Sequence, residues 1–190
     1  SGIARYEIPV LILLALKSGV YVDCHIAVFS KPELGKIKSF LYSFLLSFFT
    51  IIAHNERIRD KYKGSVLCLT PVESGEIDLV KSQTKDFDVL FTSAGYEDVS
   101  HNDFNRLVSS NLKILLTGRP SQKFLNYPNV HYLGFLSREE LLLKAGSSRC
   151  VVSFTNRDDC LLLAAREAFV WGVPVCVTGN KANRDFFGLG

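Results

Sequence analysis

The chain lacks any uninterrupted apolar run of about 20 residues, the length that an α-helix needs to span a lipid bilayer. One segment, Phe40–Ile52, carries no charge over its 13 residues and predicts a buried helix that continues into a strand. The alternative is a face that lies on a membrane surface, with Lys36 and Lys38 beside lipid phosphates. We expect no signal peptide at the start of the sequence.

Clustered cations and paired cysteines are also lacking. The 22 Lys and Arg and 19 Asp and Glu give a net charge of only +3, and no basic stripe forms, which disfavours nucleic acid as a partner. The five cysteines are odd in number and none makes a C-x-x-C pair. A disulfide framework or a zinc site would need cysteines at closer spacing, so the pattern favours reduced thiols. We therefore expect no metal or cofactor, and a cytoplasmic protein, either free or at the cytoplasmic face of a membrane.

Two nucleotide-binding motifs are missing. No G-x-G-x-x-G follows a predicted strand, which argues against a nicotinamide-dependent oxidoreductase. No Walker loop is present either, which argues against phosphate transfer by that loop.

Short β-branched runs alternate with helical segments along the whole chain. Continuous apolar runs are typical of parallel strands that are buried on both faces. The expected strands are Val20–Cys24, Thr50–His54, Ser65–Leu69, Val89–Thr92, Lys113–Thr117, Val130–Leu133, Cys150–Phe154 and Val173–Thr178. The expected helices are Ile8–Lys17, Gly35–Phe48, Glu56–Lys61, Asn102–Ser110, Arg138–Ala145, Leu161–Trp171 and Ala182–Phe187. The pattern predicts an α/β fold of Rossmann-like parallel sheets with helices on both faces.

A polar segment with Pro71 and Gly75, Thr70–Asp86, reads as a linker. We place the domain boundary there, between residues 1–72 and residues 73–190. Three strands are few for a complete domain, so the N-terminal domain is expected to be incomplete.

The segment Val151–Gly172 is the most informative strand-to-helix junction. Ligands bind at the carboxyl ends of strands in open α/β sheets, where helix N-termini attract phosphate. Asp159 falls near the expected helix start, and Glu167 lies eight positions later between small apolar residues. Without a ligand, Asp159 would be a helix N-cap, and Glu167 would pair with Arg184 or with neighbours of Arg166.

Two motifs in this half resemble the donor-binding domain of glycosyltransferase family 4, an enzyme family of GT-B fold. The segment Asn129–Ser137 matches the pattern N-V-x-x-x-G-x-x-S, and Ser137–Glu140 adds a helix capping box. The segment Glu167–Val175 matches E-A-x-x-x-G-x-P-V. Asp159 and Glu167 are similar to the family's acidic pair, with Asp in place of the first Glu. The resemblance covers roughly residues 88–187.

The resemblance implies roles for individual residues. Glu167 would contact the ribose of a nucleotide-sugar donor, and Asp159 with the backbone amides of Cys160 and Leu161 would face the donor sugar and diphosphate. Further site residues are implied in the flanking loops, namely Gly118, Gly134 and Phe135 near the base, and Arg119 and Arg157 near the diphosphate. His25 resembles the histidine that faces the donor sugar from the N-terminal domain, and is otherwise a strand-end residue; His54 is a weaker candidate.

The implied function is a retaining, metal-independent glycosyltransferase with a nucleotide-diphosphate-sugar donor and a glycan or lipid-linked acceptor. The sequence departs from the family because the loop Thr92–Asp98 lacks the basic pair that neutralises the diphosphate. Two alternatives therefore stay open. One is a non-catalytic sugar-nucleotide-binding module or fragment, and the other is a sugar-nucleotide epimerase of GT-B fold.

Overall fold

The computed structural model describes residues 21–23, 44, 50–53, 56–61, 64–67, 72–93, 99, 101–119, 126–157 and 160–188. The chain divides into two compact units, Ser1–Thr70 and Pro71–Gly190. Within the described ranges, no helix is both long enough and apolar enough to cross a membrane.

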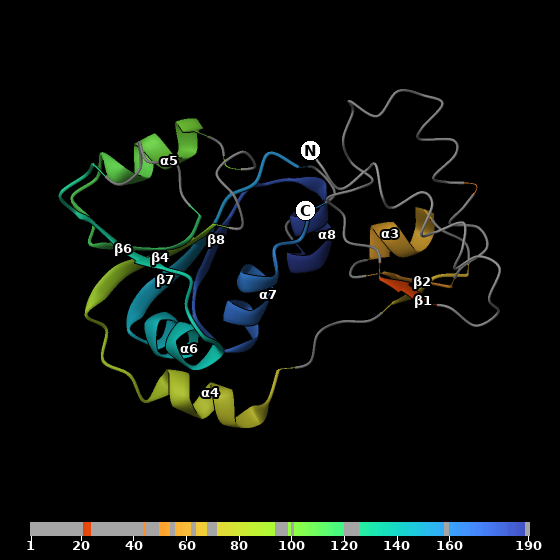
Figure 1. The fold of residues 1–190 in the computed structure, drawn as a ribbon, viewed down its shortest axis with the longest axis horizontal. Helices are drawn as coiled ribbons and strands as arrows, with labels where there is room; N and C mark the ends of the chain where they lie inside the picture. The colour runs from red at the N-terminus through yellow and green to blue at the C-terminus, as the bar shows by residue number, and fades with distance from the viewer. Residues whose placement is uncertain are drawn as a thin grey trace. The chain divides into compact units, whose positions relative to one another are not determined.

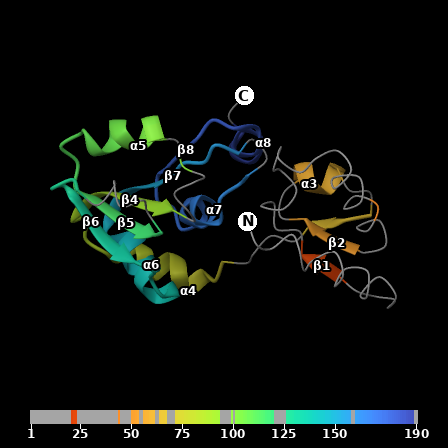
Figure 2. The same ribbon diagram turned by 45° about the horizontal axis from the view of Figure 1, so that its top comes forward.

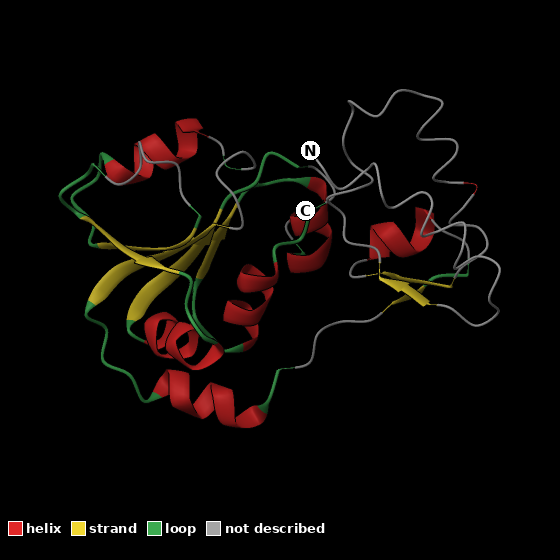
Figure 3. Cartoon of the chain, in the orientation of Figure 1, coloured by secondary structure: helices red, strands yellow, loops and turns green. Residues whose placement is uncertain are grey.

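The N-terminal unit contains a small parallel sheet. Its strands β1 (Tyr21–Asp23), β2 (Thr50–Ala53) and β3 (Val66–Leu67) pair in the order β1-β2-β3, and helix α3 (Glu56–Lys61) connects β2 to β3 (Figure 3). These elements fall within the strands and helix expected from the sequence. The expected helices Ile8–Lys17 and Gly35–Phe48 lie outside the described residues, apart from the exposed, helical Phe44.

The C-terminal unit is a five-stranded parallel sheet with helices on both faces (Figure 1). Its strands are β4 (Phe87–Ser93), β5 (Ile114–Gly118), β6 (Val130–Gly134), β7 (Ser148–Ser153) and β8 (Val175–Val177). The strand order is β6-β5-β4-β7-β8, so the chain reverses direction across the sheet after β6. Its helices are α4 (Ser74–Lys81), α5 (His101–Val108), α6 (Arg138–Gly146), α7 (Leu163–Val170) and α8 (Lys181–Phe187). The predicted α/β class is confirmed.

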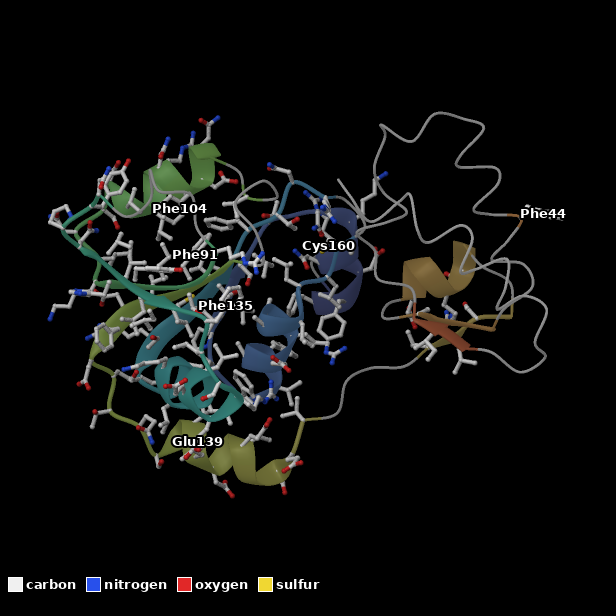
Figure 4. The ribbon with its side chains drawn as sticks, viewed as in Figure 1. Phe44, Phe91, Phe104, Phe135, Glu139 and Cys160 are labelled. Carbon is white, nitrogen blue, oxygen red and sulfur yellow. The ribbon has the colours of Figure 1, made fainter. Side chains whose placement is uncertain are left out.

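Two apolar clusters hold the layers together. On one face, side chains of α4, α6 and α7 pack around Leu90, Leu115 and Trp171. On the other face, α5 packs on Phe91 through Phe104, with ring centroids 5.0 Å apart (Figures 2 and 4). Because both faces are covered, β5 and the middle of β4, Val89–Phe91, are buried, which explains the apolar runs at these positions.

The segment predicted as a linker, Thr70–Asp86, contains helix α4, so that interpretation was wrong. Gly75 lowers the intrinsic helix propensity of this segment, and the helix has only eight residues. Its stability comes from packing instead, since Val80 is buried in the core and Ile77 and Leu79 pack against that core.

Helices α4 and α6 approach each other closely at Gly146, the last residue of α6. A Cβ atom at this position would lie 2.6 Å from Gln83 Cγ and 2.7 Å from the carbonyl oxygen of Val80. The backbone oxygen cannot move aside as a flexible side chain would, so the two helices would have to separate.

We expect Gly146→Ala to lower the free energy of unfolding of the C-terminal unit by about 1–3 kcal/mol, as overpacking does. The measurement is urea unfolding followed by the fluorescence of Trp171, the single tryptophan. Gly75→Ala in α4 is the matched control, because nothing lies within 4 Å of its Cβ. There, alanine should raise stability by about 0.5–1 kcal/mol. A stabilising Gly146→Ala would contradict the close approach.

Candidate functional site

The ends of β5 and β6 bring four of the predicted site residues together. Gly118 and Gly134 end these strands with φ values of +97° and +71°, a region that glycine occupies without strain. Thr117 Oγ1 donates a hydrogen bond to the Gly134 carbonyl at 2.7 Å, which ties the two strand ends together. Arg119 stacks over the ring of Phe135, with its Cζ 5.4 Å from the ring centroid.

Phe135 is 69% exposed in this arrangement, the most exposed large apolar side chain among the described residues (Figure 4). An exposed aromatic ring beside a guanidinium and two glycine turns is suited to stacking against a flat ring of a ligand. The position of Gly118, Gly134 and Phe135 at one strand edge is therefore compatible with the predicted contact to a base, and Arg119, predicted near the diphosphate, lies beside them.

The loop after β7 is held by Asn180, which precedes α8. The Asn180 side-chain amide donates to the carbonyls of Arg157 at 2.8 Å and Cys160 at 2.9 Å. Its Oδ1 accepts the backbone N–H of Asn183 at 2.8 Å, which caps α8. Asn180 was not predicted as a site residue, because the expected helix began at Ala182, one residue later than α8, and so hid its N-cap position. The predicted residues Arg157 and Cys160 are thus fixed by one buried amide.

Helix α7 begins at Leu163, two residues later than expected. Its N-cap is Leu162, which makes no side-chain cap, and the Cys160 N–H donates to the carbonyl of Arg157 at 3.4 Å. The amides of Cys160 and Leu161 therefore precede the helix, and those of the first turn belong to residues 163–165. Two predicted catalytic residues, His25 and Asp159, lie outside the described residues.

Glu167 is 2% exposed and forms an ion pair with Arg138, the first residue of α6. Arg138 Nη1 donates to Glu167 Oε1 at 2.5 Å. The partners expected in the absence of a ligand, Arg184 or neighbours of Arg166, were wrong. Arg184 instead donates through Nε to the Gly179 carbonyl at 2.9 Å.

Arg138 has two further partners on other helices. Its Nε and Nη2 donate to the two carboxylate oxygens of Glu76 in α4, at 2.8 and 2.9 Å. Its Cζ lies 5.1 Å from the ring centroid of Trp171, and the Trp171 Nε1–H donates to Glu76 Oε2 at 3.1 Å. We call Glu76, Arg138, Glu167 and Trp171 the charge network. The sequence analysis missed three of its members, since only Glu167 was singled out.

The start of α6 fixes where Arg138 projects. The predicted capping box is confirmed, because Ser137 Oγ accepts the Glu140 N–H and Glu140 Oε2 accepts the Ser137 N–H. Since α6 follows β6 at the carboxyl edge of the sheet, the charge network connects that edge to α4 and α7.

The hydrogen bond from Arg138 holds the pKa of the Glu76 carboxyl below its ordinary value of 4.5, with a further contribution from Trp171. The two carboxylates raise the pKa of Arg138, chiefly through the bonds to Glu76. Because the pKa of Glu76 is lower in the folded than in the unfolded chain, its ionised form stabilises the fold above that ordinary value. The contribution is lost as the pH falls through the folded pKa.

We expect Glu76→Gln to destabilise the C-terminal unit most at neutral pH, and progressively less as the pH falls below 4.5. Urea unfolding at a series of pH values, followed by Trp171 fluorescence, measures the difference between wild type and variant. Glu139→Gln removes an exposed carboxylate from the same region and corrects for the general effect of losing an acid. A difference that does not change with pH would show that ionised Glu76 contributes nothing.

Other reactive groups are sparse in the described part of the chain. No group of three or more His, Cys, Asp or Glu side chains there could hold a metal ion. Cys150, Cys160 and Cys176 are free thiols, and burial raises the pKa of Cys150 and Cys176. A thiol with a raised pKa is less often ionised and so less reactive.

No protein-family model matches the chain, and no curated protein matches it. Solved structures do match. One is HepE from Anabaena in complex with UDP and glucose, at 13% identity and a TM-score of 0.68, which covers 94% of this chain and 59% of that one. Another is sucrose-phosphate synthase from Thermosynechococcus elongatus, at 13% identity and a TM-score of 0.57, which covers 87% of this chain and 51% of that one.

The fold is GT-B. At this level of identity the likeness shows the fold alone, and membership of family 4 stays a prediction. The chain spans between half and three fifths of the length of these two structures.

Proposed function

We propose that this chain is the donor-binding part of a glycosyltransferase, with a nucleotide-diphosphate-sugar as the bound substrate. The observation that carries the proposal is the buried carboxylate of Glu167 in α7, next to the first residue of α6 at the carboxyl edge of a GT-B sheet. A carboxylate accepts hydrogen bonds from sugar hydroxyls well. Buried carboxylates are rare unless they are paired, and here the partner Arg138 occupies only one oxygen of Glu167.

Three other features support the same ligand. Gly118 and Gly134 let a ring approach the backbone, Phe135 offers an exposed face for stacking, and Arg119 and Arg157 supply cations in neighbouring loops. HepE was solved with UDP and glucose, which are the two parts of such a donor. The role of Asp159 and His25 at the donor sugar, a retaining and metal-independent mechanism, and a glycan or lipid-linked acceptor follow from the family resemblance.

The test is a thermal-shift screen of the purified chain against UDP-, GDP- and ADP-sugars and the free nucleotides, with and without Mg²⁺. A ligand that binds only the folded chain raises the midpoint by mass action. We expect one nucleotide series to raise it without Mg²⁺, and Glu167→Gln to abolish the shift. Glu139→Gln, at an exposed position of α6, should leave the shift unchanged. If none of these ligands shifts wild type, the donor site is absent.

A non-catalytic binding module is the second candidate. It is favoured by the sequence of Thr92–Asp98, which has two acids and no cation to neutralise a diphosphate. Release of sugar from the bound donor separates the two candidates. Binding with no transfer to an acceptor and no hydrolysis would favour the module, whereas turnover that is lost in Asp159→Asn would favour the enzyme.

A further inference from the structure

We infer that Arg138 is a positioning residue of the donor site, which holds one oxygen of Glu167 and directs the other to a neutral hydroxyl group of the ligand. The inference rests on the proposed function, because it requires that Glu167 contact the donor. It goes further in naming α4 and α6 as parts of the site and in assigning to Arg138 the orientation of the Glu167 carboxylate.

The two oxygens of Glu167 have different surroundings. Oε1 accepts the bond from Arg138 Nη1, while Oε2 accepts no hydrogen bond from any described residue. Among the described residues, the one fully enclosed polar side-chain atom without a partner is Asn183 Oδ1. Oε2 is not among these fully enclosed atoms, so this oxygen of the 2% exposed Glu167 keeps the capacity to accept a further hydrogen bond. A ligand hydroxyl would complete the coordination of this carboxylate.

The guanidinium of Arg138 is itself fixed in orientation. Two bonds to Glu76 form a bidentate pair, the Trp171 ring lies on one face, and the capping box sets the direction of α6. A group held this way loses little freedom when a ligand binds, so the carboxylate that it orients is preorganised. Lysine could keep the positive charge but could not hold both carboxylates in this planar geometry.

The charge of the network selects the kind of group that Oε2 accepts. Two carboxylates and one guanidinium leave a charge of −1, from Glu76, Glu167 and Arg138. An added phosphate would be repelled, whereas a neutral O–H donor would be bound by a charge-assisted hydrogen bond. The recognised group is therefore a hydroxyl, as in the ribose contact that the family resemblance implies, and a nucleotide-sugar that lacks this hydroxyl should bind more weakly.

The experiment compares the affinity of UDP, GDP and ADP with that of their 2′-deoxy and 3′-deoxy counterparts, by isothermal titration calorimetry. For wild type we expect the ribonucleotide that binds to be preferred over one deoxy form by about 10- to 100-fold, the usual effect of a hydrogen bond to a charged group. In Arg138→Lys the preference should fall to about threefold or less, whereas Glu139→Gln should keep the wild-type ratio. Glu76→Gln should give an intermediate ratio, because it loosens Arg138 without removing it.

The ratio within one variant separates positioning from stability. If Arg138 only stabilises the fold, Arg138→Lys weakens the binding of the ribonucleotide and of its deoxy form equally. The preference then stays at its wild-type value, which would overturn the inference. If Glu167→Gln abolishes the preference while Arg138→Lys keeps it, Glu167 contacts the donor but Arg138 does not position it. If no nucleotide binds wild type, the proposed function fails and the inference fails with it.

Discussion

Replacement of Trp171 by alanine is expected to lower the free energy of unfolding of the C-terminal unit by about 3–5 kcal/mol. Trp171 is 1% exposed and lies in the cluster with Leu90, Leu142 and Val173. Truncation leaves a cavity beneath the sheet, because the surrounding helices can close only partly around it. It also removes the Nε1–H that Glu76 accepts and the ring beneath the Arg138 guanidinium.

Urea unfolding followed by far-UV circular dichroism measures this loss, since the variant has no tryptophan left. Trp171→Phe keeps a ring in the core but not the N–H donor, so it should cost less than Trp171→Ala. Leu163→Ala in the same helix is the control, because this side chain is 48% exposed, and it should change stability by no more than about 0.5 kcal/mol. Equal effects of Trp171→Ala and Leu163→Ala would show that the charge network does not rest on a packed core.

The sheet could be predicted from the sequence because the signal for it is local. Strand β5 and the middle of β4, Val89–Phe91, are buried apolar runs, and β7 ends in the buried run Val151–Ser153. Strand β6 at the edge of the sheet is partly exposed, but its β-branched start and closing glycine still mark a strand. The capping box of α6 is equally local, since Ser137 and Glu140 lie three positions apart. Both features were predicted with the correct type and nearly the correct position.

Helix α4 could not be predicted in the same way. Its own sequence favours a turn, with Gly75 at its second position, and its stability depends on Val80 packing in a core built by segments far along the chain. The predicted start of α7 was wrong for a related reason. Leu162 extends the apolar pattern by periodicity, yet it is the non-helical N-cap, so the helix begins after Cys160 and Leu161 instead of at them.

The charge network could not be predicted either, because its members lie far apart in the sequence. Glu167 was singled out because a local motif marks it, but its partner Arg138 is 29 positions away and Glu76 is a further 62 positions from Arg138. Neither periodicity nor capping signals connect residues across such distances. The missed helix α4 carried Glu76, so the error in the fold and the gap in the site have one cause.

Removal of the Arg138 side chain in Arg138→Met should lower the free energy of unfolding by about 3 kcal/mol. The substitution leaves Glu167, whose side chain is 3% exposed, as a buried carboxylate without its cation. Loss of one partner of a buried pair costs about 3–5 kcal/mol, and the lower end applies because Arg138 is itself 42% exposed and partly screened by water.

A double-mutant cycle shows whether this cost belongs to the pair. Glu167→Gln removes the charge that Arg138→Met would leave unpaired, so the double variant should be more stable than the sum of the two single effects predicts, by about 1–3 kcal/mol. Urea unfolding followed by Trp171 fluorescence gives all four stabilities. Arg149→Met paired with Asp88→Asn is the control cycle, because that exposed contact of 3.7 Å should show little coupling. Additive effects of the two substitutions would mean that solvent already screens the carboxylate, so that Arg138 could not fix the orientation of Glu167. The positioning of Oε2 requires a strong coupling energy between Arg138 and Glu167.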